Sequence, residues 1–318
     1  MGWGRRWKVA KRRMLQSFPL CLTALLVAGC GIGAGPAPSA VHLTVTSDFG
    51  GHVVHTWSAP KVQGQETVMS LLMRNASVST RYSGGFVQSI DGLAGGSEGG
   101  QPVDWFYYVN GAEAPMGAAA TTVHPGDHIW WDRHDWAQTD TIPAVVGSFP
   151  EPFLNGIEGK RLPVRIECAD LAGAACRTVS TRLSRLGVPA ALAAIGLAGE
   201  PESLHVLVGP WTAVRAGAGA GAIAEGPHAS GVYARLSASG ATLTVLNPEG
   251  VPARTLGAGA GLIAATRYAE ADPVWVVTGT DDAGVELAAR SFDRATLENH
   301  FAVALLPGGG VLPAPVEG

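Results

Sequence analysis

One stretch of sequence, DWFYYVNG at residues 104–111, decides the fold of the first half of the chain. Successive side chains of a β-strand point to opposite faces of the sheet, so this strand carries large apolar groups on both of its faces. At least one of these faces must pack on another element. One face is expected to carry Trp105, Tyr107 and Val109, and the other to carry Phe106 and Tyr108.

The sequence around this strand predicts a small domain that runs from residue 41 to residue 136. A helix is indicated by the spacing of Val68, Leu71 and Leu72, with Thr67 as its N-cap. Asn110-Gly111 is a dipeptide typical of a hairpin turn. Two strands, one helix and then further strands is the order of a β-grasp. The strand candidates are residues 41–46, 53–57, 86–90, 105–109 and 128–132.

Aromatic residues are concentrated in this domain, where nine of the 22 in the chain lie between Thr80 and Trp136. Trp and Tyr beside polar groups line recognition surfaces more often than cores, which favours a binding module. The alternative is that the second half of the chain or neighbouring loops cover the aromatic face. The candidate ligand contacts are Phe86, Asp91, Trp105, Tyr107, Tyr108, Asn110, Trp130, Asp132 and His134.

The N-terminal segment predicts export. Residues 1–29 combine a basic start with an apolar run over residues 18–28, which is shorter than the roughly 20 residues that span a bilayer. The run ends in VAGC at residues 27–30, which resembles the bacterial lipoprotein box, so Cys30 is the predicted lipidation site. The alternative is an ordinary secretory cleavage site with a chance cysteine. Residues 30–40 are low in bulky side chains and predict a flexible tether.

The net charge argues against two classes of partner. The predicted signal peptide carries six basic and no acidic residues, so its removal moves the formal charge from −4 to −10. A protein this acidic, without a basic run, is a poor candidate for nucleic acid or for anionic lipid headgroups. The expected membrane contact is therefore the lipid anchor, and the expected location is extracytoplasmic, at the bacterial cell membrane.

The second half of the chain predicts a different architecture. A Pro-rich linker at residues 137–160 precedes a mixed α/β domain at residues 161–306, and residues 307–318 are expected to be a disordered tail. Cys168 and Cys176 predict a disulfide, because they are an even pair in an exported chain. A zinc site is the sharper alternative, but two cysteines without a nearby histidine supply too few ligands. The main expected elements are strands at residues 164–168, 204–208 and 274–277, a helix at 171–186, and a helix at 281–292 capped by Thr280.

The sequence gives little support for a catalytic site or for a cofactor site. The letters of a nucleophile elbow at residues 95–99 sit in a glycine-rich loop rather than between a strand and a helix. The glycine string at residues 217–222 lacks the strand and acidic residue of a dinucleotide site. Asp132 and His134 share a strand face and could hold a metal or polar ligand, although a solvated strand end is the simpler interpretation. We therefore expect no catalytic residues, no metal and no cofactor, with an envelope hydrolase as the weaker alternative.

Three segments together resemble the transcobalamin-like C-terminal domain: residues 86–92, residues 104–111 and GDHIWW at residues 126–131. The resemblance covers roughly residues 41–136 and implies a β-rich fold. In the animal vitamin B12 carriers this domain closes over one face of a corrinoid, and bacterial relatives are often lipoproteins of unknown function. This chain lacks the run of helices that cups the other face of the ligand in those carriers.

These observations predict an α+β protein, with a β-grasp-like domain and a mixed α/β domain behind a lipoprotein signal peptide. The expected function is binding at the membrane surface, with a corrinoid-like small molecule as the ligand that the resemblance implies. The alternative is a structural or adaptor lipoprotein whose aromatic face packs on an envelope protein or on its own second domain.

Overall fold

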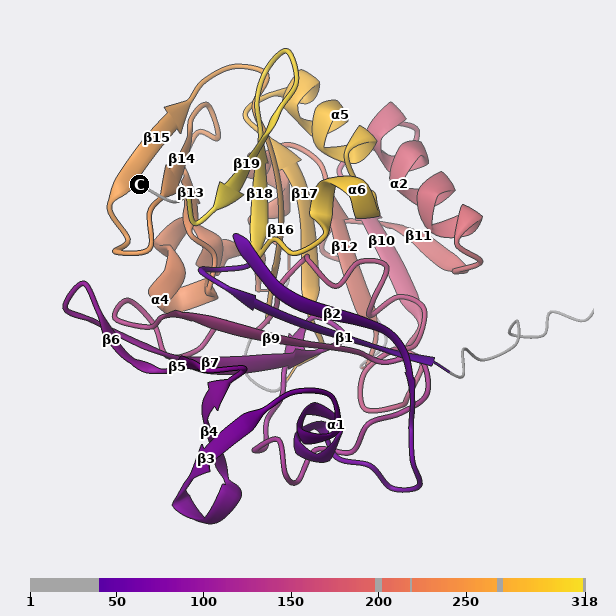
Figure 1. Cartoon of the computed structure of the whole chain (residues 1–318). Coiled ribbons are helices and arrows are strands. Elements are labelled where there is room, and N and C mark those ends of the chain that lie inside the picture. The colour runs from indigo at the N-terminus through magenta and orange to yellow at the C-terminus, as the bar shows by residue number, and fades with distance from the viewer. Residues whose placement is uncertain (1–39, 198–201, 218, 268–270, 317–318) are drawn as a thin grey trace, which may run out of the picture. The chain divides into compact units, whose positions relative to one another are not determined.

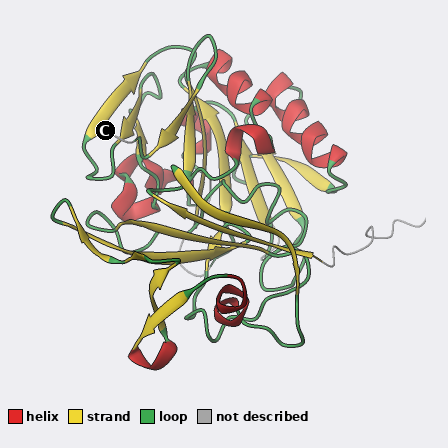
Figure 2. Cartoon of the chain, viewed as in Figure 1, coloured by secondary structure: helices red, strands yellow, loops and turns green. Residues whose placement is uncertain are grey.

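The computed structural model describes residues 40–197, 202–217, 219–267 and 271–316 (Figure 1). The chain has a mixed α/β architecture with several sheets (Figure 2). The predicted signal peptide, Cys30 and nearly all of the tether lie outside the described residues.

The first sheet joins the strands of the first half in the order β2-β1-β9-β7-β6, with β8 paired to β7. Strands β1 and β9 are parallel, and the other neighbours are antiparallel. Asn110 and Gly111 both have positive φ between β7 and β8, which confirms the predicted turn. The strands are β1 (Ala40–Ser47), β2 (His52–Lys61), β6 (Gly96–Glu98), β7 (Gln101–Val109), β8 (Ala112–Glu113) and β9 (His128–Asp135).

Helix α1 (Val68–Asn75) covers one face of this sheet (Figure 1). Thr67 caps it as predicted, because its hydroxyl accepts the amide of Ser70 while the Ser70 hydroxyl accepts the amide of Thr67. Buried residues of α1 form one core with Trp105 and Val109. A small side sheet contributes to the same core through Val87 and Ile90; it consists of β3 (Val78–Arg81), the short helix η1 (Tyr82–Gly84), β4 (Phe86–Ile90) and β5 (Leu93–Ala94).

The second half builds a seven-stranded sheet in the order β11-β10-β12-β17-β16-β18-β19. Strands β10, β11, β12 and β17 are parallel, and β16, β18 and β19 continue the sheet antiparallel. Helices α2 (Ala174–Arg185) and α5 (Asp282–Arg290) pack on one face of this sheet (Figure 2). The strands are β10 (Val164–Cys168), β11 (Ala190–Ala194), β12 (Leu204–Val208), β16 (Gly261–Thr266), β17 (Val274–Gly279), β18 (Ala302–Leu305) and β19 (Val311–Ala314).

A smaller three-stranded sheet and several short helices cover the other face of the large sheet. Trp211 and Ile223 of these short helices are buried with Leu207 of β12. The elements are α3 (Trp211–Val214), η2 (Ala220–Glu225), α4 (Pro227–Ser230), β13 (Ala234–Leu236), β14 (Leu243–Leu246) and β15 (Pro252–Leu256). The short helix α6 (Arg294–Leu297) lies on the face of α2 and α5 instead, because its Leu297 shares their core.

Two local expectations differ from the structure. The N-cap of α5 is Asp281, not Thr280, because the Asp281 carboxylate accepts the amide of Gly284 at 2.9 Å. Thr280 instead donates its hydroxyl to the carbonyl of Gly257. The C-terminal segment, expected to be disordered, forms β19, since pairing with β18 supplies backbone hydrogen bonds that its Gly/Pro-rich composition does not reveal.

The Pro-rich segment at residues 137–160, expected to be a linker, contributes side chains to the hydrophobic cores on both faces of the large sheet. Ile142, Val145 and Phe149 are buried, as is Phe153. The Phe149 ring lies 5.0 Å from that of Phe292 in the core beneath the large sheet. The segment therefore packs against both sheets, although its prolines exclude regular structure.

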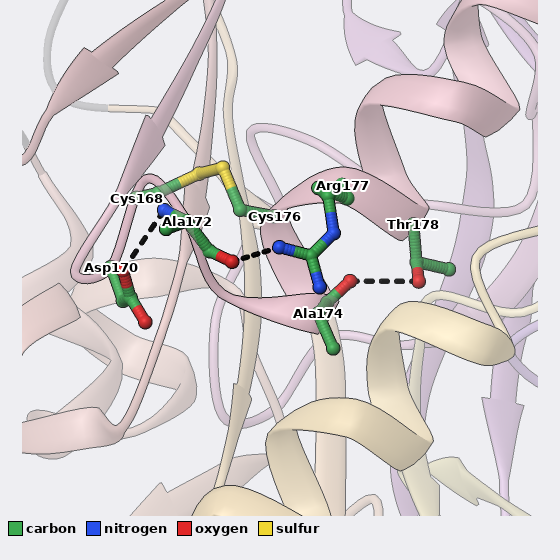
Figure 3. Close-up of a disulfide and its surroundings, with 7 residues drawn as sticks. All are labelled: Cys168, Asp170, Ala172, Ala174, Cys176, Arg177 and Thr178. Carbon is green, nitrogen blue, oxygen red and sulfur yellow. Dashed lines mark hydrogen bonds between the residues drawn. A yellow bond between two sulfur atoms is a disulfide. The ribbon is translucent and has the colours of Figure 1, made fainter.

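The predicted disulfide is present between Cys168 and Cys176 (Figure 3). It joins the end of β10 to the first turn of α2. Around it, the carboxylate of Asp170 accepts the amide of Ala172 at 2.9 Å, and the guanidinium of Arg177 donates to the Ala172 carbonyl. Closing so short a loop contributes about 2.5 kcal/mol to stability in the chain-entropy model.

A third core joins the two halves of the chain. Phe301, which precedes β18, packs edge-to-face on three rings of the first half, those of Phe49, Tyr108 and Trp130. The ring centroids lie 5.3, 5.6 and 5.2 Å from that of Phe301. Trp130 is 0% exposed and Tyr108 is 1% exposed. The second aromatic face of the first sheet is therefore covered by the chain's own second half.

Truncation of Phe301 should be costly because its ring fills the centre of this shared core. Phe301→Ala is expected to lower the free energy of unfolding by about 3–5 kcal/mol, as is typical for a buried phenylalanine. Urea denaturation followed by Trp fluorescence measures the change. Leu171→Ala, at a side chain that is 47% exposed, is the control and should change stability by less than about 0.5 kcal/mol. Equal effects of the two variants would contradict the shared core.

Candidate functional site

The Asp132 carboxylate, one of the predicted ligand contacts, lies at the centre of a buried network and is 0% exposed. It accepts the amides of Phe49 at 3.1 Å and Gly50 at 2.9 Å, and the Thr46 hydroxyl. It also bonds Nδ1 of His134 at 2.8 Å. Each carboxylate oxygen thus has protein partners, which holds the β1–β2 turn against β9.

His134 is buried among aromatic rings and is not exposed to solvent. Its imidazole stacks on Phe106 at 4.5 Å and lies 4.7 Å from the ring of Phe49. The expected solvated strand end is therefore wrong for this pair, because the second half of the chain covers it. Within the described ranges, no group of three or more His, Cys, Asp or Glu side chains is arranged to hold a metal ion.

Asn110 is also fully buried and fully bonded. Its amide group donates to the Asp127 carboxylate and to the Gly156 carbonyl, both at 2.8 Å, and its oxygen accepts the amide of His128 at 2.8 Å. The indole N–H of Trp130 likewise donates to Thr46 at 2.7 Å. These groups tie the hairpin turn to β9 and to the Pro-rich segment.

The remaining predicted contacts lie nearer the surface. Asp91 is exposed and its carboxylate accepts the amide of Ser77 at 2.8 Å. Trp105 is buried, with its indole N–H donating to the Leu93 carbonyl at 3.1 Å. Phe86 is partly exposed beside Tyr82. Contact of the nine residues with a ligand stays a prediction, and the buried ones, Trp105, Tyr108, Asn110, Trp130, Asp132 and His134, could reach one only after a rearrangement.

The structure shows a candidate binding site beside the predicted set. A cavity of about 260 Å³, here called the apolar cavity, lies next to the β7–β8 turn. The residues that line it come from the first sheet, from the loop that follows β8, from the Pro-rich segment and from the position directly after β16. Its walls are mostly apolar, and it is lined by Val109, Ala112, Glu113, Ala114, Pro115, Met116, Ala120, Thr121, Thr122, His124, Ile157, Glu158 and Arg267.

Tyr107 holds the loop that forms one wall of the apolar cavity. Its hydroxyl donates to the Met116 carbonyl and lies 2.7 Å from the Thr121 hydroxyl. Burial raises the pKa of Tyr107, so the hydroxyl stays protonated at neutral pH. Residues 116–121 are therefore fixed by a predicted site residue that does not itself line the cavity.

The polar side chains of the apolar cavity include a carboxyl group and a guanidinium group that lie close together, those of Glu113 and Arg267; the others are Thr121, Thr122, His124 and Glu158. Burial raises the pKa of Glu113 to about 7, an effect that Asp140 strengthens and that the Ile142 backbone and Arg267 oppose. Arg267 donates to the Glu113 carbonyl at 3.5 Å and to the Ala271 carbonyl. The site can therefore offer a carboxyl group near its titration point and a guanidinium group to a ligand.

Sequence reasoning missed these residues. Glu113 follows the predicted hairpin turn directly, and a lone carboxylate there reads as an exposed loop residue. Arg267 lies 154 positions further along the chain, so only the packing of the two halves brings it to the cavity. The proximity of Glu113 to the turn was the single local signal available.

Comparison with known families gives one match. A family model described as a domain of unknown function (DUF4430) matches residues 65–135, which include α1, β4, β7 and β9. No curated protein matches the chain. In the part of the chain that the structure describes, no helix is long and apolar enough to cross a bilayer.

Glu113 should make stability depend on pH in a defined direction. Its pKa is raised from 4.5 to about 7, so its contribution is complete below pH 4.5 and is lost as the pH rises through 7. Glu113→Gln stays neutral and should match the parent protein in stability near pH 4.5. At pH 8 it should be more stable, by at most about 3 kcal/mol.

Urea denaturation at several pH values measures this difference. Glu249→Gln, which removes the charge of an exposed carboxylate, is the matched control, and its difference from the parent should not change with pH. If the stability difference between Glu113→Gln and the parent protein is the same at pH 5 and at pH 8, the pKa of Glu113 is not raised in the folded protein.

Proposed function

We propose that the protein is a lipid-anchored extracytoplasmic binding protein that takes a small, largely apolar molecule into the apolar cavity. On this proposal a lipoprotein signal peptide at residues 1–29 is removed before Cys30, and the mature chain carries a β-grasp-like, transcobalamin-like domain followed by a mixed α/β domain. Binding, not catalysis, is the proposed activity.

The observation that carries the proposal is the composition of the apolar cavity. Ligand sites are concave and mostly apolar, with a few polar groups that fix orientation, and they favour domain interfaces. This cavity has mostly apolar walls, a few polar groups that include Glu113 and Arg267, and contributions from both halves of the chain. Its loop wall is held by Tyr107 and Thr121, so little entropy would be lost on binding.

The size of the cavity limits the ligand. About 260 Å³ lies just under the roughly 300–1,000 Å³ typical of sites for drug-sized molecules. A corrinoid could place only a peripheral group inside it, with the ring outside against exposed residues such as Met116. A corrinoid-like ligand thus stays one candidate within the broader proposal, supported by the resemblance of residues 86–92, 104–111 and 126–131.

One observation favours a second candidate, a structural or adaptor role. The aromatic face formed by Phe49, Tyr108 and Trp130 packs on Phe301 and Tyr233 of the same chain. On this alternative the first domain serves to position the second beside the membrane, and the apolar cavity stays empty.

Filling the apolar cavity should abolish binding. The probe is 8-anilinonaphthalene-1-sulfonate, which combines an apolar ring system with an anionic group that Arg267 can bind. With residues 30–318 produced as a soluble protein, its fluorescence should rise saturably with one site per chain. Ala120→Trp, at an exposed residue of the cavity wall, should weaken this binding by at least about tenfold, because the indole occupies the space of the probe.

Ala119→Trp is the matched control, since Ala119 is equally exposed but does not line the cavity. It should bind the probe like the parent protein. Displacement of the probe by cobalamin would support the corrinoid candidate. If the probe does not saturate, or if Ala120→Trp and Ala119→Trp weaken its binding equally, the apolar cavity is not the binding site. Either result would favour the adaptor role.

Lipidation at Cys30 has its own test. Cys30→Ala should abolish incorporation of radiolabelled palmitate and shift the protein from the membrane fraction to the soluble one, because the proposed anchor is attached to that thiol. Cys21→Ala, within the predicted signal peptide, should leave both unchanged. Retention of the label in Cys30→Ala would contradict the anchor.

A further inference from the structure

A second cavity, independent of the proposed ligand site, lies against β1 and β9. Its volume is about 300 Å³, and we call it the histidine cavity because His42 and His128 both line it. Its other walls come from the Pro-rich segment and from α6. It is lined by Ala40, His42, Thr44, Thr56, Gly126, His128, Gly147, Ser148, Phe149, Pro150, Glu151, Leu154, Asn155, Arg294 and Glu298.

The two imidazoles share one face of the sheet. His42 and His128 are direct partners in the parallel β1–β9 register, and their rings meet edge-to-face with centroids 6.2 Å apart. Burial lowers the pKa of His128 to about 4, with His42 and Arg294 adding to the effect. His128 is therefore neutral at physiological pH.

A hydrogen bond fixes His128 as part of the wall. Its Nε2 lies 3.0 Å from the Thr44 hydroxyl. This hydrogen bond holds the ring of His128 against β1.

Charge at the histidine cavity comes from α6 and the Pro-rich segment. The Arg294 guanidinium is exposed and has no ion-pair partner within the described ranges. Burial lowers the pKa of His42, the Arg294 charge lowers it further, and Glu298 opposes the change. Glu151 is buried and burial raises its pKa to about 7, so it is partly neutral at that pH. The available cation is therefore only partly offset by carboxylates.

Part of the lining of the histidine cavity is apolar. Phe149 is 5% exposed, Pro150 is buried and Leu154 is half-buried. Ala40 adds a small apolar group from the start of β1. A guanidinium beside an apolar wall matches a molecule with a carboxylate at one end and a short hydrocarbon chain at the other.

We propose that the histidine cavity binds a small organic carboxylate, with Arg294 and His42 at the carboxylate and Phe149, Pro150 and Leu154 along the hydrocarbon. Arg294 supplies a planar fork of N–H donors, which suits a carboxylate. Protonation of His42 adds a second donor and a second positive charge. The site uses none of the residues of the apolar cavity, so its test does not depend on the proposed function.

The experiment follows the imidazole Cε1–H signal of His42 by NMR in residues 30–318 during titration with hexanoate, acetate and inorganic phosphate. The signal is assigned with His42→Gln. Hexanoate should shift it saturably and raise the pKa of His42, since an adjacent anion favours the charged ring. Acetate should bind about tenfold or more weakly than hexanoate, because it lacks the methylenes that contact the apolar wall.

Two variants and a control test whether hexanoate binds in the histidine cavity. Arg294→Gln should weaken hexanoate binding by about tenfold or more, through loss of a charged hydrogen bond. Glu298→Gln should tighten it, because a repelling carboxylate is removed. Arg290→Gln, on α5 and paired with Glu286, should leave binding unchanged.

Clear outcomes would overturn the proposal. One is a His42 signal that does not respond to millimolar hexanoate. His228, an exposed histidine outside the cavity, serves as the reference signal that should not respond. Another is a response that Arg294→Gln leaves intact. Phosphate that competes as well as hexanoate would replace the organic carboxylate with a simple oxyanion site and so contradict the role of the apolar wall.

Discussion

Burial of the first sheet's second aromatic face is the interaction on which the rest of the structure depends. Tyr108 and Trp130 would expose large apolar rings if this face met water, and Phe301 of the second half encloses them. The same packing buries Asp132 and His134, so their hydrogen bonds are shielded from bulk solvent and fix the β1–β2 turn. Two halves with different sheets thus share one core.

The shared core also sets where ligands can bind. Because the sheet face is closed, open space lies beside it, at the β7–β8 turn and along β1 and β9. Each cavity combines residues of the first sheet with residues of the Pro-rich segment and of the second half. Arg267 and Arg294 are the cations that the second half contributes. A change in how the halves pack would therefore alter both cavities at once.

Local sequence signals predicted the elements well where they depend on nearest neighbours. The Asn110-Gly111 turn, the Thr67 cap and the strands Phe86–Ile90 and Val164–Cys168 follow from residue types at fixed spacing, and the disulfide follows from an even cysteine pair. The candidate site was harder to predict. The sequence pattern around Tyr108 and Trp130 would be the same whether their rings faced solvent or packed on Phe301. Arg267 reaches Glu113 only through long-range packing, and β19 forms only because β18 is beside it.

Native-state hydrogen exchange tests the shared core most directly, since it reports the free energy at which each strand opens. The account predicts that amides in β7 and β9 of the first sheet and in β16 and β17 of the second exchange only on global unfolding, with the same free energy. Exchange in β7 and β9 at a free energy several kcal/mol lower than in β16 and β17 would show that the first sheet opens on its own, and would contradict the claim that Phe301 joins the two halves into one core.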